Sequence, residues 1–209
     1  AEDWGSDEAD RDGEVTLHIP EEHFFPWSPD SPFLYDLTVG TTQGEEEQRD
    51  TVHSYFALRK WSCAPDVHGI MRFCLNGKPI LLNGLLDQGY WPEGLYTPPS
   101  DGAVVRELQT IKELGFNLLR KHAKIEPQRW YYHCDKLGLI VWQDMVNGGG
   151  PYKLWFVTYL TNVFQPLLRR LPDARPLWGL LGRETEAGRE EYARELEATV
   201  TVSYTHLRA

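Results

Sequence analysis

Apolar and polar residues alternate along three segments in the first third of the chain, residues 14–19, 33–39 and 51–58. A period of two residues predicts β-strands that bury one face. A polar run, residues 41–49, separates the last two segments and is typical of an exposed turn. The pattern therefore predicts antiparallel strands of the kind that build a β-sandwich. Three strands are too few for a whole sandwich, and we expect the missing strands to precede Ala1.

The pattern changes near residue 66, where a turn-like segment indicates a domain boundary. Beyond this point, two short apolar runs flank Asn76-Gly77. This dipeptide between apolar runs is the strongest short-range signal for a β-hairpin. The sequence therefore predicts a hairpin at the start of the second part of the chain.

Between residues 82 and 142, short apolar runs alternate with two segments of helical period. Ser100 and Gly115 are the expected N-cap and C-terminal stop of the first helix, and the second is expected between Pro127 and Gly138. The apolar face of the first helix consists of Val104, Leu108, Ile111 and Leu114. Strand, helix, strand, helix, strand in units of ~30 residues predicts a parallel sheet.

Two later segments also have helical character, residues 154–163 and the strongly charged residues 184–200. The charged segment is expected to be a solvated helix. The final residues 201–209 (TVSYTHLRA) resemble a tail that recurs on unrelated assembled sequences as a read-through artefact. We therefore expect residues 201–209 not to be native sequence.

Composition excludes several classes of function. The net charge of −10 argues against a nucleic-acid-binding protein, which usually carries a basic stripe. No apolar run approaches the ~20 residues that span a bilayer, so no membrane partner is expected. The three cysteines lack the spacing of a metal site, and no phosphate-loop or dinucleotide-binding motif is present. We therefore expect no metal and no cofactor.

Polar residues follow each strand of the predicted parallel sheet. Because ligands of such sheets bind at the carboxyl ends of the strands, these residues are candidates for a binding site. The candidates are Asp87, Trp91, Arg120, His122, Asp144 and Asn147. Each carboxylate alone could instead cap a helix, and a lone arginine usually pairs with a carboxylate. Their common position at three consecutive strand ends favours a site.

Several ordered motifs resemble glycoside hydrolase family 2. The motifs are residues 27–37 (WSPDSPFLYDL), 73–84 (FCLNGKPILLNG), 117–122 (NLLRKH) and 132–144 (YHCDKLGLIVWQD). The resemblance implies a multidomain β and α/β protein. Residues 1–66 would be part of an immunoglobulin-like β-sandwich, and residues 67–200 the first βα units of an incomplete TIM (β/α)8 barrel.

The same resemblance implies hydrolysis of β-glycosides with retention of configuration. That reaction needs two carboxyl groups ~5–5.5 Å apart, as acid/base and nucleophile. The family's acid/base is the Glu of an Asn-Glu pair, which this sequence lacks, and its nucleophile follows a later strand. We therefore expect no catalytic residue in this chain and no activity of the chain alone. By position, Arg120 would hold the nucleophile's carboxylate, while Asp87, His122 and Asp144 would line the sugar pocket.

Two other interpretations remain open. The chain could be a non-catalytic carbohydrate-binding or interaction module, in which Tyr90, Trp91 and Trp142 stack on sugar rings. It could also be a small α/β enzyme that uses Asp87 and Asp144 directly. Sugar binding would support the first alternative, and loss of activity on changing either aspartate would support the second.

Overall fold

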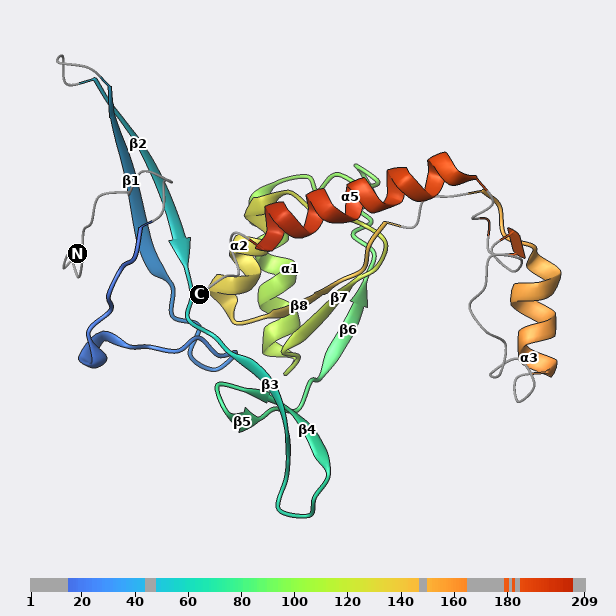
Figure 1. Ribbon diagram of the computed structural model, residues 1–209, viewed down its shortest axis with the longest axis horizontal. Coiled ribbons are helices and arrows are strands. Elements are labelled where there is room, and N and C mark those ends of the chain that lie inside the picture. Colours follow the sequence, from blue (N-terminus) through green and yellow to red (C-terminus); the bar gives the residue numbers. More distant parts are fainter. Residues whose placement is uncertain are drawn as a thin grey trace.

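The computed structural model describes residues 15–43, 48–146, 150–164, 179, 180, 182 and 185–204. Within these residues, the chain forms three small sheets and several helices, and the sheets do not close into a barrel (Figure 1). The mixed β and α/β character predicted from the sequence is confirmed.

The first sheet is a long antiparallel hairpin. After a short 3-10 turn, η1 (Glu21–His23), strand β1 (Tyr35–Gln43) pairs with β2 (Gln48–Phe56) along its whole length. The predicted strand at residues 14–19 is wrong in its described part, since residues 15–20 are in no strand. Alternation alone does not make a strand, because the backbone also needs a partner to complete its hydrogen bonds.

The second sheet is also antiparallel and contains β3 (Trp61–Pro65), β4 (Met71–Leu75) and β5 (Lys78–Pro79). The predicted hairpin is confirmed, because Asn76 and Gly77 form the turn between β4 and β5 with φ of 52° and 77°. Two consecutive positive φ angles are the signature of the tight hairpin turn that Asn-Gly favours. The β3–β4 pair crosses residue 66, where the sequence predicts a boundary.

The third sheet is parallel, as predicted, with β7 between β6 and β8. Its elements in chain order are β6 (Gly84–Asp87), α1 (Asp101–Glu113), β7 (Leu118–Lys121), α2 (Gln128–Leu137) and β8 (Ile140–Gln143). The Ser100 hydroxyl caps α1 by accepting a hydrogen bond from the Ala103 amide at 3.2 Å. Gly138 ends α2 with φ of 75°, a conformation that glycine adopts without strain.

The two faces of the parallel sheet have different surroundings. Leu85, Leu119 and Val141 are neighbours on the face that α1 and α2 cover. The core between this face and the helices contains Val104, Leu108, Trp130, Cys134 and Leu139. Leu114, predicted to belong to this core, is instead largely exposed, because the helix ends there and the chain turns away at Gly115.

The opposite face is buried at one end and open at the other. Near the amino ends of the strands, Leu118 and Ile140 pack against Trp27 and Leu75. Two residues further along, the neighbours Leu86, Arg120 and Trp142 lie on the same face and are exposed. We call these three residues the open row. The sheet therefore offers an uncovered surface next to the carboxyl ends of its strands.

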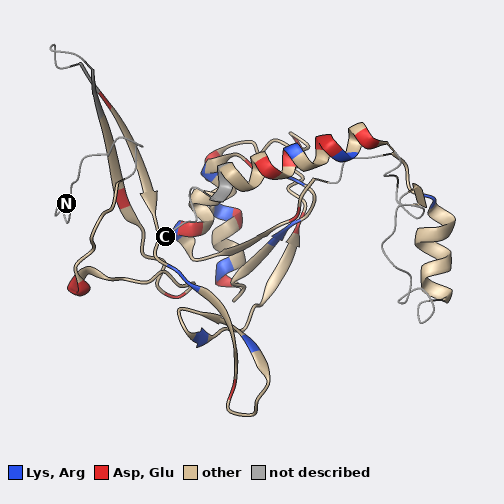
Figure 2. Ribbon diagram, viewed as in Figure 1, with Lys and Arg blue, Asp and Glu red and all other residues tan. Residues whose placement is uncertain are grey.

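The later segments are helical, as predicted. A π-helix, η2 (Trp155–Leu160), continues into α3 (Thr161–Val163), and α5 (Glu186–Tyr204) runs past the predicted end at residue 200. Acidic and basic residues are interspersed along α5 (Figure 2). None of the described helices has the length and apolar character needed to cross a membrane.

Trp27 fastens the N-terminal part of the chain to the parallel sheet. Its side chain is fully buried, and its indole Nε1 donates a hydrogen bond of 2.8 Å to the carbonyl of Asp135 in α2. Its backbone amide donates to Leu58, and its carbonyl accepts from the side-chain amide of Asn76. The Arg59 guanidinium lies 4.8 Å from the ring centroid. The backbone and side chain of this one residue thus join the segment after β2, the hairpin turn and the end of α2.

We predict that Trp27→Ala lowers the free energy of unfolding by about 3–5 kcal/mol, the usual cost of deleting a buried large aromatic side chain. Urea unfolding followed by far-UV circular dichroism measures this change without relying on tryptophan emission. Trp155→Ala is the matched control, because the Trp155 side chain is mostly exposed, and its cost should stay below about 1 kcal/mol. Equal unfolding midpoints for the two variants would contradict the role given to Trp27.

Candidate functional site

The structure brings Arg120 and Asp144 together at the carboxyl edge of the parallel sheet. Arg120 is the next-to-last residue of β7, and Asp144 follows β8 directly. The Arg120 guanidinium makes a bidentate contact with the Asp144 carboxylate, in which Nε donates to Oδ1 at 3.1 Å and Nη2 donates to Oδ2 at 2.9 Å. These hydrogen bonds hold the pKa of Asp144 below its ordinary value. The site therefore presents an arginine already arranged to grip a carboxylate.

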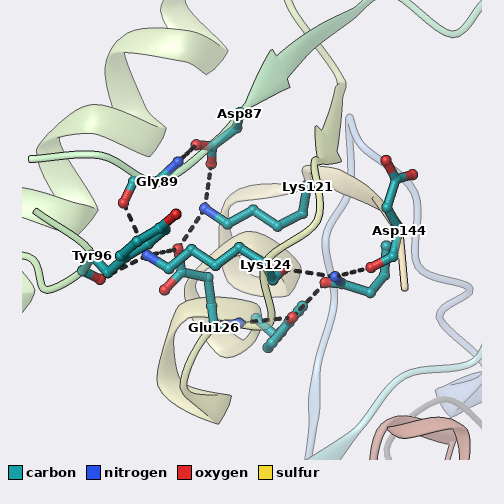
Figure 3. Close-up of polar contacts among 9 residues, drawn as sticks. Asp87, Gly89, Tyr96, Lys121, Lys124, Glu126 and Asp144 are labelled. Atoms are coloured by element: carbon teal, nitrogen blue, oxygen red, sulfur yellow. Dashed lines mark hydrogen bonds and ion pairs between the residues drawn. The ribbon is translucent and has the colours of Figure 1, made fainter. Parts of the chain in front are cut away.

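The next residue, Lys121, points to the other side of the sheet and is buried. Its side chain is 1% exposed, and its Nζ lies 2.9 Å from Asp87 Oδ2 and 2.5 Å from Glu126 Oε1 (Figure 3). The Trp130 ring centroid is 4.6 Å from the same ammonium. A buried ammonium is stable only when it is paired, and here two carboxylates and an aromatic face surround it.

Lys124 extends this network to the loop between β6 and α1. Its Nζ contacts Glu126 Oε1 at 2.8 Å and donates to the carbonyls of Gly89 and Tyr96 at 2.9 and 2.8 Å. The loop after β6 and the loop after β7 are therefore linked through two ammonium groups. We call Asp87, Lys121, Lys124 and Glu126 the buried charge network.

Gly89 is the position where this network leaves no room for a side chain. Its φ is 64°, and a Cβ there would lie 2.5 Å from Glu126 Oε1 and 2.7 Å from the Nζ atoms of both lysines. Its amide donates a hydrogen bond of 2.7 Å to Asp87 Oδ1. Both oxygens of Asp87 are thus engaged by the protein, one by this amide and the other by Lys121.

Sequence reasoning missed Lys121, although a signal was present. Lys121 follows Leu119 by two positions, so the period of a strand places both on the face that the helices cover. A charge on that face needs partners of opposite sign, and Asp87 pairs with Lys121 in the strand register. Glu126 could not have been found this way, because it lies in a loop whose path is not encoded by periodicity.

The remaining predicted site residues are placed as follows. The His122 ring Nδ1 lies 3.0 Å from the side-chain amide nitrogen of Gln88, and both residues are exposed. Trp91 is half-buried and packs against the core between the sheet and the helices. Asn147 lies outside the described residues. The described part of the chain contains no group of three His, Cys, Asp or Glu side chains that could hold a metal ion.

Comparisons with known proteins find that this chain is similar to part of several β-glycosidases. A β-galactosidase of Photobacterium profundum is 29% identical over 182 residues, which are 83% of this chain and 17% of that protein. A β-galactosidase of Leuconostoc mesenteroides is 27% identical over 155 residues, 72% of this chain and 14% of the relative. An exo-β-D-glucosaminidase of Amycolatopsis orientalis is 28% identical over 130 residues, 58% of this chain and 12% of the relative. No family model matches the chain.

Solved structures show a shared fold over the matched region. A β-glucuronidase of Parabacteroides merdae superposes with a TM-score of 0.53 at 24% identity, covering 63% of this chain and 16% of that one. A β-glucuronidase of Dictyoglomus thermophilum gives a TM-score of 0.55 at 16% identity, covering 66% and 24%. Together with the curated relatives, these similarities confirm the resemblance to glycoside hydrolase family 2. The chain spans less than a fifth of the length of the curated relatives described above.

We predict that Gly89→Ala lowers the free energy of unfolding by about 3 kcal/mol or more, because it adds backbone strain and breaks a buried ion pair. Gly115→Ala is the matched control, since Gly115 has φ of 88° with open space around it and should lose only about 1 kcal/mol of strain. Thermal and urea unfolding of both variants measure the difference. Equal losses would contradict the tight fit of Gly89 against the network.

We predict that Arg120→Gln raises the pKa of Asp144 toward its ordinary value. Arg120 stabilises the ionised carboxylate, so its contribution is present above the unfolded-state pKa and is lost as the pH falls through the lowered folded-state pKa. Carboxyl carbon NMR titration across the acidic range measures the change. Arg72→Gln, which breaks the similar exposed pair of Arg72 with Asp66, should leave the Asp144 titration unchanged. An unchanged Asp144 curve in Arg120→Gln would contradict the pairing.

Proposed function

We propose that this chain is part of a retaining β-glycosidase and that the carboxyl edge of its parallel sheet forms part of the sugar-binding site. The similarity to β-galactosidases over 83% of the chain is the observation that carries this proposal. In this proposal, residues 1–66 belong to an immunoglobulin-like sandwich domain, and residues 67–200 supply the first βα units of a (β/α)8 barrel.

The position of Arg120 supports this proposal. In a (β/α)8 barrel, the sheet face opposite the helices is the interior, and the active site lies at the carboxyl ends of the strands. Arg120 is in the open row, on the face that α1 and α2 do not cover, and its side chain is about half exposed. Its two-pronged contact with Asp144 has the geometry with which an arginine would orient a catalytic carboxylate.

We further propose that the two catalytic carboxyl groups lie outside these 209 residues. The acid/base of a retaining glycosidase must be protonated before it acts, so its pKa has to be raised. Arg120 lowers the pKa of Asp144 and so keeps this carboxylate ionised, which does not suit a general acid. Asp87 is engaged at both oxygens, and we assign it the role of positioning the β6–α1 loop.

A second candidate function is a non-catalytic carbohydrate-binding module. The exposed aromatic rings of Tyr90 and Trp142 near the carboxyl edge favour it. This module would bind glycosides without cleaving them, even when joined to the remainder of its natural polypeptide. The assay below therefore separates the two candidates.

The test uses chromogenic p-nitrophenyl β-D-galactoside and β-D-glucuronide. We predict no turnover by the 209-residue chain and turnover by the protein expressed from the complete reading frame that encodes it. In that longer protein, Arg120→Ala should lower kcat/KM by about 100-fold, as expected when one preorganised electrostatic contact is removed. Arg72→Ala, which removes an arginine of similar exposure from an ion pair between β4 and the β3–β4 loop, should have little effect.

Three results would contradict the proposal. Turnover by the 209-residue chain at the rate of the longer protein would show that the catalytic groups lie within it. Absence of turnover by the longer protein would favour the binding module. Equal kcat/KM values for the two arginine variants would remove Arg120 from the site.

A further inference from the structure

Asp135 in α2 forms a charged contact with the N-terminal part of the chain. Its Oδ1 atom lies 3.1 Å from Nη1 of Arg59, and both side chains are largely buried. Its Oδ2 atom accepts a hydrogen bond of 3.1 Å from the Tyr55 hydroxyl. Burial and the negative charge of Asp135 raise the pKa of Tyr55, so this hydroxyl remains a donor. Residues from β2 and from the segment after it therefore bind both oxygens of one carboxylate.

Aromatic rings fix the orientation of these contacts. The Arg59 guanidinium lies 4.8 Å from the Trp27 ring centroid, and the Tyr55 ring meets the Tyr132 ring edge-on with centroids 5.1 Å apart. Tyr132 and Asp135 are three positions apart in α2, so they are neighbours on the surface of the helix. This surface of α2 is fitted against the N-terminal part of the chain, which sets the rotation of the helix about its own axis.

Near its amino end, α2 supports the carboxyl edge of the sheet. The Tyr131 hydroxyl donates a hydrogen bond of 2.5 Å to Gln143 Oε1, and the Gln143 side-chain amide donates to the carbonyl of Asp144 at 2.7 Å. The Asp144 carboxylate in turn binds Arg120. A continuous series of contacts therefore leads from Arg59 through α2 to the candidate site.

A small rotation of α2 is enough to disturb this series. Side chains end ~6 Å from the axis of their helix, so a rotation of ~10° moves their ends by ~1 Å. A displacement of ~1 Å at the reacting groups can lower the rate of an enzyme by about 100-fold, even when its cause lies far from the chemistry. The fit of Asp135 against Arg59 and Tyr55 is thus able to influence how Asp144 is placed.

We propose that Arg59 and Tyr55 are positioning residues for the Arg120–Asp144 site and act on it through α2. This inference rests on the proposed function. It adds that the N-terminal part of the chain helps to set the geometry of the sugar-binding edge. The activity of the site then depends on an ion pair at the opposite end of α2.

The first experiment changes one end of the series and measures the other, because contiguity alone does not establish coupling. The Asp144 carboxyl carbon is followed by NMR titration in the 209-residue chain. Arg59→Gln should move the pKa of Asp144 upward toward its ordinary value, because Arg120 and Asp144 lose part of their alignment. Arg129→Gln is the matched control and should leave the curve unchanged, because it removes from α2 an ion pair with Asp101 whose side chains are both more than half exposed.

The second experiment uses the protein expressed from the complete reading frame, with p-nitrophenyl β-D-galactoside and β-D-glucuronide. Arg59→Gln should lower kcat/KM about tenfold, less than the cost of a full ~1 Å displacement. Tyr55→Phe, which keeps the ring and removes one hydrogen bond, should lower it about threefold. Arg129→Gln should stay within about twofold of the unaltered protein. Circular dichroism and thermal unfolding establish that each variant is folded at the assay temperature. If Arg59→Gln does not fold, Tyr55→Phe decides by the same two measurements.

The outcomes separate this inference from the proposed function. An unchanged Asp144 titration, or an unchanged kcat/KM in a longer protein that is active, would overturn the inference and leave the proposed function standing. Equal effects of Arg59→Gln and Arg129→Gln would also overturn the inference. A changed Asp144 titration without turnover by the unaltered longer protein would support the coupling through α2 and overturn the proposed function.

Discussion

The carboxyl edge of the parallel sheet depends on one buried ammonium group, that of Lys121. Placing a positive charge in a protein interior is unfavourable unless carboxylates surround it, and removing one partner leaves an uncompensated charge. Asp87 and Glu126 must therefore lie beside Lys121. This requirement fixes the positions of the two segments that carry them, the end of β6 and the loop before α2. The ends of β6 and β7 and the start of α2 are thereby fixed relative to one another.

Hydrogen bonds between uncharged groups extend this constraint to β8, the third strand of the parallel sheet. Tyr131 in α2 donates a hydrogen bond of 2.5 Å to Gln143 Oε1, and the Gln143 amide donates to the backbone carbonyl of Lys124 at 2.7 Å. Each strand of the parallel sheet thus has an end residue linked to the loop that follows β7, in the case of β6 through Lys121. Rigid support of this kind holds functional groups at a fixed spacing, which is what a site that recognises a stereochemically defined ligand requires.

Local signals were sufficient for much of the fold. The Asn76-Gly77 turn and the Ser100 cap depend on neighbouring residues alone, and the parallel strands could be predicted because both their faces are apolar near the amino end. The failures were non-local. Residues 15–19 alternate correctly but have no described strand beside them, and periodicity carries no information about a partner.

The candidate site could also be predicted only in part, because its local signals are visible in the sequence and its non-local contacts are not. Strand periodicity and the rule for parallel sheets placed Arg120 and Asp144 at one edge, and the structure joins them. The rule could not say which face each residue uses, so Asp87 was grouped with them although it is bound by a lysine on the helix-covered side. The Trp91 side chain packs against the core because its neighbours in space come from α1 and α2, which the loop sequence does not reveal.

The Trp27 contact has a consequence for how this polypeptide matures on the ribosome. The indole and its acceptor carbonyl are 108 positions apart, and the pocket is lined in part by Leu118 of β7 and Ile140 of β8, which are translated long after Trp27. At about 5–20 residues per second, the tryptophan emerges on the order of ten seconds before its pocket can exist. During that interval a large apolar side chain and the hairpin that follows it are exposed together, which leaves this stretch of the nascent chain open to non-native association until β7 and β8 have been made.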